Sequence, residues 1–294
     1  MNELDIISKT LDRLPSFHEM PVGPGDDCAQ IVVENGLALV TSDMLLDGKH
    51  FDSKLHTLEE IINKVLGVNC SDIYAMGGLP TFASITIAFP NLNTNRGAFP
   101  DAVAKACNKY KVTLSGGDTN TWDGPLAVSL TLYGTAIKEP ILRSGAKKGD
   151  LIFVTGKLGG SLASSRHLDP PNKRDAVVKL LDNLEISSMI DISDGLATDL
   201  RHILKASKVG AIIDSYSVPI HEDASSLDEA LCDGEDFELC FTVDQKNADL
   251  IEKLGLDKSL GLYRIGKTTP NKNLLQLQTD SRLIEYQNVG FEHQ

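Results

Sequence analysis

Apolar positions along the chain repeat with two periods, one typical of helices and one typical of strands. In several segments, residues three or four apart form one apolar face, and Thr57 and Glu60 form a capping box at the start of one of them. Gly210 is expected to end the last long helix. The predicted helices cover residues 2–14, 57–76, 98–110 and 196–208, with two short helical stretches flanking residues 169–171.

Short apolar runs bounded by Gly, Pro or Asp lie between these helices and predict strands. Because strands and helices alternate, the pattern favours an α/β or α+β protein. A length of 294 residues suggests roughly two domains, and a break at Glu139 and Pro140 divides the chain into residues 1–138 and 139–294. The predicted strands cover residues 29–33, 37–41, 82–89, 112–114, 126–136, 151–154, 189–192, 211–213 and 237–243, with a turn at 34–36.

Composition narrows the class of protein. The chain carries 41 acidic against 28 basic residues, and this net charge of −13 disfavours binding to nucleic acid. No run of about 18 apolar residues is present, which predicts no membrane span. The charged, amphipathic N-terminus argues against a secretory signal, and the 5 scattered cysteines are typical of reduced thiols rather than of a zinc site. We therefore expect a cytoplasmic protein.

Aspartates recur at places where a strand or a loop edge ends in small residues. Any one of them alone is common in turns and helix caps. Asp72 differs because it lies inside the apolar 57–76 helix, where a carboxylate needs a metal or a basic partner. Carboxylates suit Mg²⁺, and neighbouring glycines let a backbone approach phosphate, so the set predicts a multi-metal phosphate site. The other segments are Gly25-Asp26-Asp27, Thr41-Ser42-Asp43, Gly116-Gly117-Asp118, Asp191-Ile192-Ser193-Asp194-Gly195 and Gly234-Glu235-Asp236.

Two familiar motifs are excluded by their context. Residues 261–268 have the spacing of a Walker A loop, but residues 262–265 alternate like a strand and Pro270 blocks the helix that should follow. The acids of residues 191–195 are spaced wrongly for an EF-hand, and no Glu closes a loop of about 12 residues.

Seven short motifs follow one another along the chain: GPGDDCA, TSDMLLDGKHF, NCSDIYAMGG, SGGDT, LRSGAKKGD, MIDISDGLATDL and DGEDFELCF. Together they cover residues 20–243, with a weaker match at Gly290 and Phe291, and any one alone would be unspecific. In this order they resemble the motifs of thiamine-monophosphate kinases, a family related to aminoimidazole ribonucleotide synthetase and selenophosphate synthetase.

The resemblance implies a two-domain fold, a homodimer joined through the N-terminal sheets, and ATP bound near the domain junction. It also assigns residues, although Arg143, His50, Tyr110 and Phe291 could equally be surface or packing residues. The implied magnesium ligands are Asp27, Thr41, Ser42, Asp43, Asp72, Asp118, Asp191 and Asp194. The implied ATP contacts are Tyr110, Gly117, Arg143 and Ser193, and the implied thiamine phosphate contacts are His50, Glu235 and Phe291.

The implied reaction is transfer of phosphate from ATP to thiamine monophosphate, the last step in making thiamine diphosphate. The acceptor is a phosphate monoester that is largely a dianion near pH 7, so no general base and no phosphoenzyme is expected. Several Mg²⁺ ions would neutralise and align the two polyanions, with Asp43, Asp72 and Asp118 essential and Arg143 stabilising the transferring group.

The chain departs from the family pattern in two places. The segment between residues 156 and 189 is shorter than in many relatives, and Asp233 stands where they often have glycine.

Other assignments of function stay open. A selenophosphate synthetase should carry a reactive N-terminal Cys, and a hydrogenase maturation factor should end in Cys; neither marker is present. Aminoimidazole ribonucleotide synthetase lacks such a marker but fits the motifs less well. A non-catalytic protein that binds divalent cations or nucleotide is the alternative of a different class.

Overall fold

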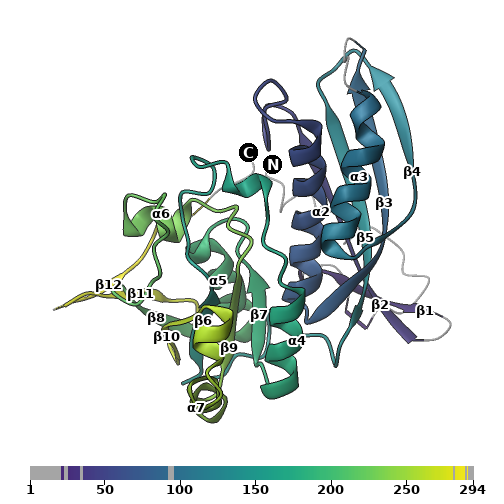
Figure 1. Ribbon diagram of the computed structural model, residues 1–294. Helices are drawn as coiled ribbons and strands as arrows, with labels where there is room; N and C mark the ends of the chain where they lie inside the picture. The colour runs from purple at the N-terminus through teal and green to yellow at the C-terminus, as the bar shows by residue number, and fades with distance from the viewer. Residues whose placement is uncertain are drawn as a thin grey trace, which may run out of the picture.

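The computed structural model describes residues 21–22, 26–33, 36–91, 96–280, 282–288 and 290. Two sheets lie side by side with helices between and around them (Figure 1). The helix predicted at residues 2–14, most of the turn at 34–36, and Phe291 lie outside the described residues.

The first sheet has the strand order β1-β2-β5-β3-β4. Neighbouring strands are antiparallel except β3 and β4, which run parallel because α3 (Phe99–Tyr110), preceded by the short η1 (Arg96–Ala98), connects them. The strands are β1 (Ala29–Val33), β2 (Gly36–Leu46), β3 (Gly78–Pro90), β4 (Thr113–Trp122) and β5 (Ala127–Ala136).

One face of this sheet is buried beneath α2 (Leu58–Ala75) and α3. Along β2, Leu39 and Leu45 are buried on that face, whereas Met44 on the other face is exposed. Because side chains alternate along a strand, Thr41 and Asp43 share the face of Leu39 and Leu45, toward α2. The alternation therefore turns two polar residues of β2 inward.

The second sheet has the strand order β12-β11-β8-β10-β6-β9-β7, with only β11 and β8 parallel. Its strands are β6 (Leu151–Thr155), β7 (Ser188–Asp191), β8 (Gly210–Asp214), β9 (Leu239–Val243), β10 (Leu262–Thr269), β11 (Leu275–Gln278) and β12 (Leu283–Glu285). Its helices are η2 (Arg166–Leu168), α4 (Arg174–Asn183), α5 (Leu196–Ser207), α6 (Leu227–Cys232), α7 (Gln245–Lys253) and α8 (Leu256–Leu260). None of the described helices is both long and apolar enough to cross a membrane.

Helix α2 belongs to both halves of the molecule. It packs on the first sheet and also contacts β7 and β9 of the second (Figure 1). Residues Phe153 and Phe241 of the second sheet accordingly share one apolar core with α2, while α5 covers the opposite face. The polar groups of a helix that is buried on most of its sides need partners nearby. The charged side chains of Lys64 and Asp72 on α2 therefore indicate where polar clusters lie.

Most predicted elements are confirmed, and three details are corrected. The capping box at Thr57 begins α2 as predicted. Lys208, with φ of 57°, ends α5; Gly210 instead begins β8, where a Cβ would lie 2.0 Å from the Asn271 carbonyl oxygen. The strand predicted at residues 112–114 extends to 122, so residues 115–118 lie within β4 rather than after it. The strand predicted from residue 237 begins at 239, because Phe237 has φ of 52°. Of the residues 261–268 with Walker A spacing, Gly261 precedes β10 and the other residues lie within this strand.

Candidate metal and phosphate site at the domain junction

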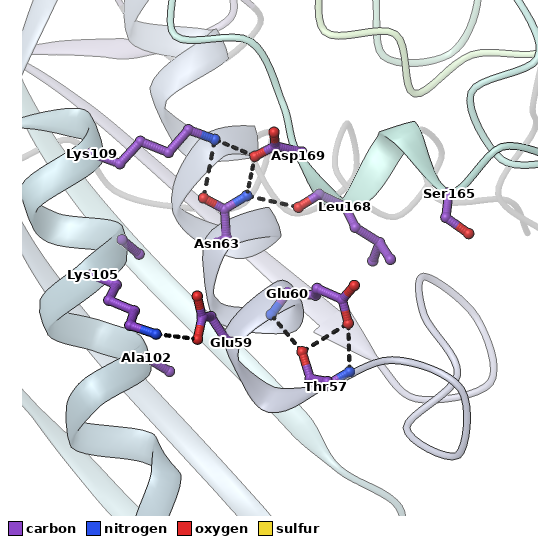
Figure 2. Close-up of a pocket in the computed structure, with 11 residues that line it drawn as sticks. Thr57, Glu59, Glu60, Asn63, Ala102, Lys105, Lys109, Ser165, Leu168 and Asp169 are labelled. Carbon is purple, nitrogen blue, oxygen red and sulfur yellow. Dashed lines mark hydrogen bonds and ion pairs between the residues drawn. The ribbon is translucent and has the colours of Figure 1, made fainter.

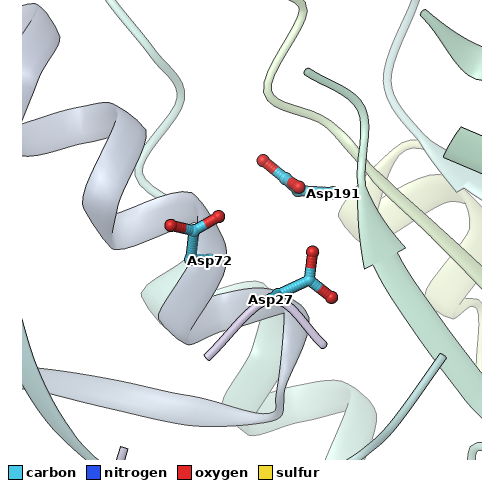
Figure 3. A group of neighbouring side chains, drawn as sticks. All are labelled: Asp27, Asp72 and Asp191. Carbon is cyan, nitrogen blue, oxygen red and sulfur yellow. The ribbon is translucent and has the colours of Figure 1, made fainter. Parts of the chain in front are cut away.

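Three aspartates from separate elements meet at the junction (Figure 3). Asp27 precedes β1, Asp72 is on α2, and Asp191 ends β7. One carboxylate oxygen from each lies within 4.8 Å of the others. The ligand oxygens of an octahedral Mg²⁺ lie about 3 to 4 Å apart, so a small inward movement would bring the set to ligand spacing.

Polar neighbours fix the orientation of these carboxylates. The Thr41 hydroxyl donates to Asp72 Oδ2 at 2.6 Å, and the Ser71 hydroxyl donates to Asp191 Oδ2 at 2.7 Å. Asp43 lies beside Asp72, and its Oδ2 is buried with no hydrogen-bond partner among the described residues. An orphaned buried carboxylate oxygen is costly and is typical of a position that receives a cation.

Arg143 supplies the positive charge next to this cluster. Its Nη2 donates to Asp27 Oδ1 at 2.9 Å and its Nε donates to Asp27 Oδ2 at 3.3 Å, a two-pronged contact. Its backbone N–H donates to both Asp26 carboxylate oxygens, at 3.2 and 3.1 Å. Burial acts to lower the pKa of Arg143, but Asp27 and Asp26 outweigh it and raise that pKa.

Negative charge exceeds positive charge in the cluster. Burial first, and Asp27 second, raise the pKa of Asp191 to about 8. Burial also raises the pKa of Asp43 to about 6, and the pKa of Asp72 rises well above its usual value through burial and then through Asp43. One arginine does not balance these carboxylates, so the donor set fits a hard divalent cation.

Other predicted ligands lie outside the trio. Ser42 faces away from α2, where its hydroxyl lies 3.0 Å from Thr131 Oγ1. Asp118 is exposed on the edge strand β4, and Asp194 follows β7 without joining the trio. The structure thus brings together the side chains of Asp27, Thr41, Asp43, Asp72 and Asp191.

The structure does not bring Tyr110, Gly117 and Ser193 together, because they lie at the end of α3, on the edge strand β4 and after β7. Tyr110 is fully buried, and its hydroxyl donates to the Pro170 carbonyl at 2.7 Å. Gly117 on β4 lies so close to the neighbouring strand β3 that a Cβ would lie 1.9 Å from the Ile85 carbonyl oxygen, so only glycine fits. Ser193 follows β7, and its carbonyl accepts the Glu235 N–H at 2.7 Å.

Glu235 belongs to a second polar cluster, which sequence reasoning missed in part. Its Oε2 accepts from the Lys64 ammonium at 2.7 Å and lies 3.1 Å from His167 Nδ1. Lys64 also donates to the His50 carbonyl at 2.6 Å, so two predicted thiamine phosphate contacts meet at one lysine. The lone Lys in the apolar run of residues 61–68 was the available signal for this cluster.

A surface pocket of about 620 Å³ lies between α2, α3 and residues 165–169 (Figure 2). Its lining includes the ion pairs of Lys105 with Glu59 and of Lys109 with Asp169. Among the described residues, none of the predicted site residues lines this pocket. Its lysines are already paired with acids, and Glu60 accepts hydrogen bonds from Thr57.

The fold and this acidic junction define an α/β protein with two sheets and a candidate site for a divalent cation between them. The family model for the AIR synthase related protein N-terminal domain matches residues 25–136, and the model for the C-terminal domain matches residues 147–275. The chain belongs to this family, and the predicted resemblance is confirmed.

Several sequence relatives that match nearly the whole chain are named thiamine-monophosphate kinase. The chain is 36% identical over 300 residues to a thiamine-monophosphate kinase of Rhodopirellula baltica, covering 96% of this chain and 94% of that relative. It is 32% identical over 320 residues to the thiamine-monophosphate kinase of Escherichia coli K12, covering 99% and 98%. A solved structure described as AaThiL complexed with AMPPCP and TMP superposes with a TM-score of 0.79 at 27% identity, covering 97% of both chains.

Proposed function

We propose that the chain transfers the γ-phosphate of ATP to thiamine monophosphate, giving ADP and thiamine diphosphate. An oxygen of the acceptor phosphate forms the new bond to the γ-phosphorus, and the bond from that phosphorus to the β–γ bridging oxygen breaks. The observation that carries the proposal is the convergence of Asp27, Asp72 and Asp191 at the junction. It is supported by relatives named for this activity over their full lengths.

The donor set supports a dependence on Mg²⁺, held by Asp27, Asp43, Asp72 and Asp191, with Thr41 orienting Asp72. When bound there, Mg²⁺ would neutralise phosphate charge and orient the transferring group. We keep Asp118, Asp194 and Ser42 as further candidate ligands of a multi-ion site.

The chain's own residues prepare the two substrates. Arg143, held by Asp26 and Asp27, is placed to stabilise negative charge on the phosphates. His50 and Glu235, joined through Lys64, form the candidate acceptor side, with Phe291 as a further candidate contact. Tyr110, Gly117 and Ser193 are the candidate ATP side. No general base is required, because the acceptor phosphate is already largely ionised near pH 7.

We propose a homodimer formed through the outer face of the first sheet. Met44 is 59% exposed and Phe82 is 51% exposed on that face, with Tyr133 beside Phe82. No helix of the described part of the chain covers this face, and apolar residues gathered on such a face are typical of an interface. Size-exclusion chromatography with light scattering tests this, and Met44→Lys should shift a dimer toward monomer.

The same proposal includes the division into residues 1–138 and 139–294 and a cytoplasmic location. The division is supported by the two sheets, which end at Ala136 and begin again at Leu151. Net negative charge supports the absence of nucleic acid among its partners.

Product analysis tests the proposed activity. The protein is incubated with Mg-ATP and thiamine monophosphate, and thiamine diphosphate and ADP are separated by chromatography. The two products should appear in equal amounts and disappear with a chelator. Binding of Mg-ATP without either product would reject this acceptor and favour a binding protein built on the same scaffold.

A further inference from the structure

Lys64 of α2 is fully buried, yet its ammonium has a complete set of partners. Its Nζ lies 2.6 Å from the His50 carbonyl oxygen, 2.7 Å from Glu235 Oε2 and 2.8 Å from His167 Nδ1. An ammonium has three protons, and three polar atoms lie within hydrogen-bond distance of it. His167 Nδ1 also lies 3.1 Å from Glu235 Oε2, so the histidine ring contacts both members of the ion pair.

The three partners come from segments that are distant in the sequence. His50 lies between β2 and α2, His167 lies in η2, and Glu235 lies between α6 and β9. The separations from Lys64 to His167 and Glu235 are 103 and 171 residues. One buried charge therefore ties a segment of the first half to two segments of the second.

Glu235 is held on its backbone as well as on its side chain. Its N–H donates to the Ser193 carbonyl at 2.7 Å, and its carbonyl accepts from the Ser161 hydroxyl at 2.7 Å. Its φ of 52° is unusual for a residue with a side chain and persists where surrounding contacts fix it. The side chain retains 21% exposure, and its polar contacts with described residues are made by Oε2. Within the described part of the chain, Oε1 is therefore open to a ligand.

We infer that Lys64 is a positioning residue that sets the acceptor side of the site by holding the His50 segment and the Glu235 carboxylate in one arrangement. This rests on the proposed function, in which His50 and Glu235 contact thiamine phosphate. Lys64 cannot touch the substrate itself, since no part of its side chain is exposed. Its effect on the reaction passes through these two partners.

The test compares Lys64→Met with Lys105→Met. Met fills a similar volume without charge, and Lys105 is a matched control because its side chain is 63% exposed and pairs only with Glu59 among the described residues. Lys64→Met should raise the KM for thiamine monophosphate about 10- to 100-fold, because a displaced contact group costs that much. The KM for ATP should stay within about twofold of wild type. Lys105→Met should change neither.

A double substitution separates positioning from general destabilisation. If Lys64 acts through Glu235, then Glu235→Gln should raise the KM for thiamine monophosphate in the wild-type background and add little in the Lys64→Met background. Equal losses toward both substrates, or an unchanged KM in folded Lys64→Met, would overturn the inference. Absence of thiamine diphosphate from the wild-type protein would instead reject the proposed function.

Should Lys64→Met fail to fold, His167→Leu serves as the second variant. It keeps the pair of Lys64 with Glu235 but removes one of the three partners. Its KM for thiamine monophosphate should rise at least about threefold, as expected for the loss of a hydrogen bond to a charged group. An unchanged KM in folded His167→Leu also overturns the inference.

Discussion

Two carboxylate clusters lie at the same domain junction and are built in opposite ways. Around Asp191, carboxylates from three elements crowd together with Arg143 as the neighbouring cation. Around Glu235, a single carboxylate receives a lysine ammonium and lies beside a histidine. Both clusters are largely buried, so the difference between them is in charge balance rather than in exposure.

The pKa shifts follow that difference. Burial raises the pKa of Asp191 to about 8. Burial also acts to raise the pKa of Glu235, but His167 and Lys64 reverse the effect and lower it. The acidic cluster around Asp191 has excess negative charge and is incomplete until a cation binds. The balanced cluster, formed by Lys64, His167 and Glu235, already has its compensating charge and holds its segments in place. The first is suited to binding and the second to positioning.

The largest effect that tests the difference in charge balance is expected for Asp72→Asn. This change should lower the rate of thiamine diphosphate formation at least about 100-fold, because it removes a central candidate ligand. It should also raise the free energy of unfolding of the metal-free protein by about 1 kcal/mol or more, since one buried repulsive charge is gone. Steady-state kinetics and urea unfolding in EDTA measure the two effects.

Asp182→Asn is the matched control, because Asp182 is an exposed carboxylate on α4. It should leave both quantities unchanged. Near-normal activity of Asp72→Asn would remove Asp72 from the reaction, and a loss of stability in EDTA would show that the cluster is not repulsive.

Binding of Mg²⁺ alone provides a second contrast that does not depend on turnover. The wild-type protein should gain about 2.7 kcal/mol of stability when Mg²⁺ is present at 100 times its dissociation constant. Asp72→Asn should lose most of this gain, while Lys64→Met should keep it. Thermal unfolding with increasing MgCl₂, against NaCl of equal ionic strength, measures it. An equal gain in all three proteins would mean that Mg²⁺ binds elsewhere.

The balanced cluster should respond to substitution in the opposite direction. Lys64→Met should destabilise the protein by about 3 to 5 kcal/mol, because Glu235 is left buried without its cation. Adding Glu235→Gln should recover part of that loss, since the uncompensated charge is removed. Urea unfolding of the two single variants and the double variant gives the coupling. Purely additive losses would contradict a compensated pair.

The sequence predicted the acidic cluster better than the balanced one, for a physical reason. Asp72 could be identified because a carboxylate inside an apolar helix needs a partner. Asp191 could be identified because it lies at the end of a predicted strand. Lys64 carried the same local signal but could not be interpreted, because two of its partners lie more than 100 residues away. Local patterns identify unusual residues, and only the topology pairs them.

The side-chain alternation and the length of strands also limited the prediction of the site. Alternation along β2 separates Ser42 from Thr41 and Asp43, so neighbours in one motif face opposite sides of the sheet. Asp118 was expected after a strand that was thought to end at residue 114, but β4 continues to Trp122. The helix boundaries were predicted more closely, because the capping box at Thr57 is a local contact.

Asp236 is intermediate between the two clusters in its charge balance. Its carboxylate is buried, accepts the Gly159 N–H and pairs with Arg166 at 3.0 Å, while Arg166 is 25% exposed. Burial raises its pKa to about 6, above the value of 3.8 for an exposed Asp, despite Gly159 and Arg166. One partial partner therefore compensates less than Lys64 does for Glu235.

A carboxyl whose pKa is raised in the folded state binds its proton more tightly there than in the unfolded chain. Its contribution to stability is therefore lost as the pH rises from about 4 to about 6, and it is constant above that range. Relative to Asp236→Asn, the wild-type protein should lose about 1 to 3 kcal/mol between pH 4 and pH 7. Urea unfolding of both proteins in EDTA measures this difference, with the exposed Asp249→Asn as control. A difference that is equal at both pH values would contradict this expectation, because it would mean that the pKa of Asp236 is the same in the folded and unfolded states.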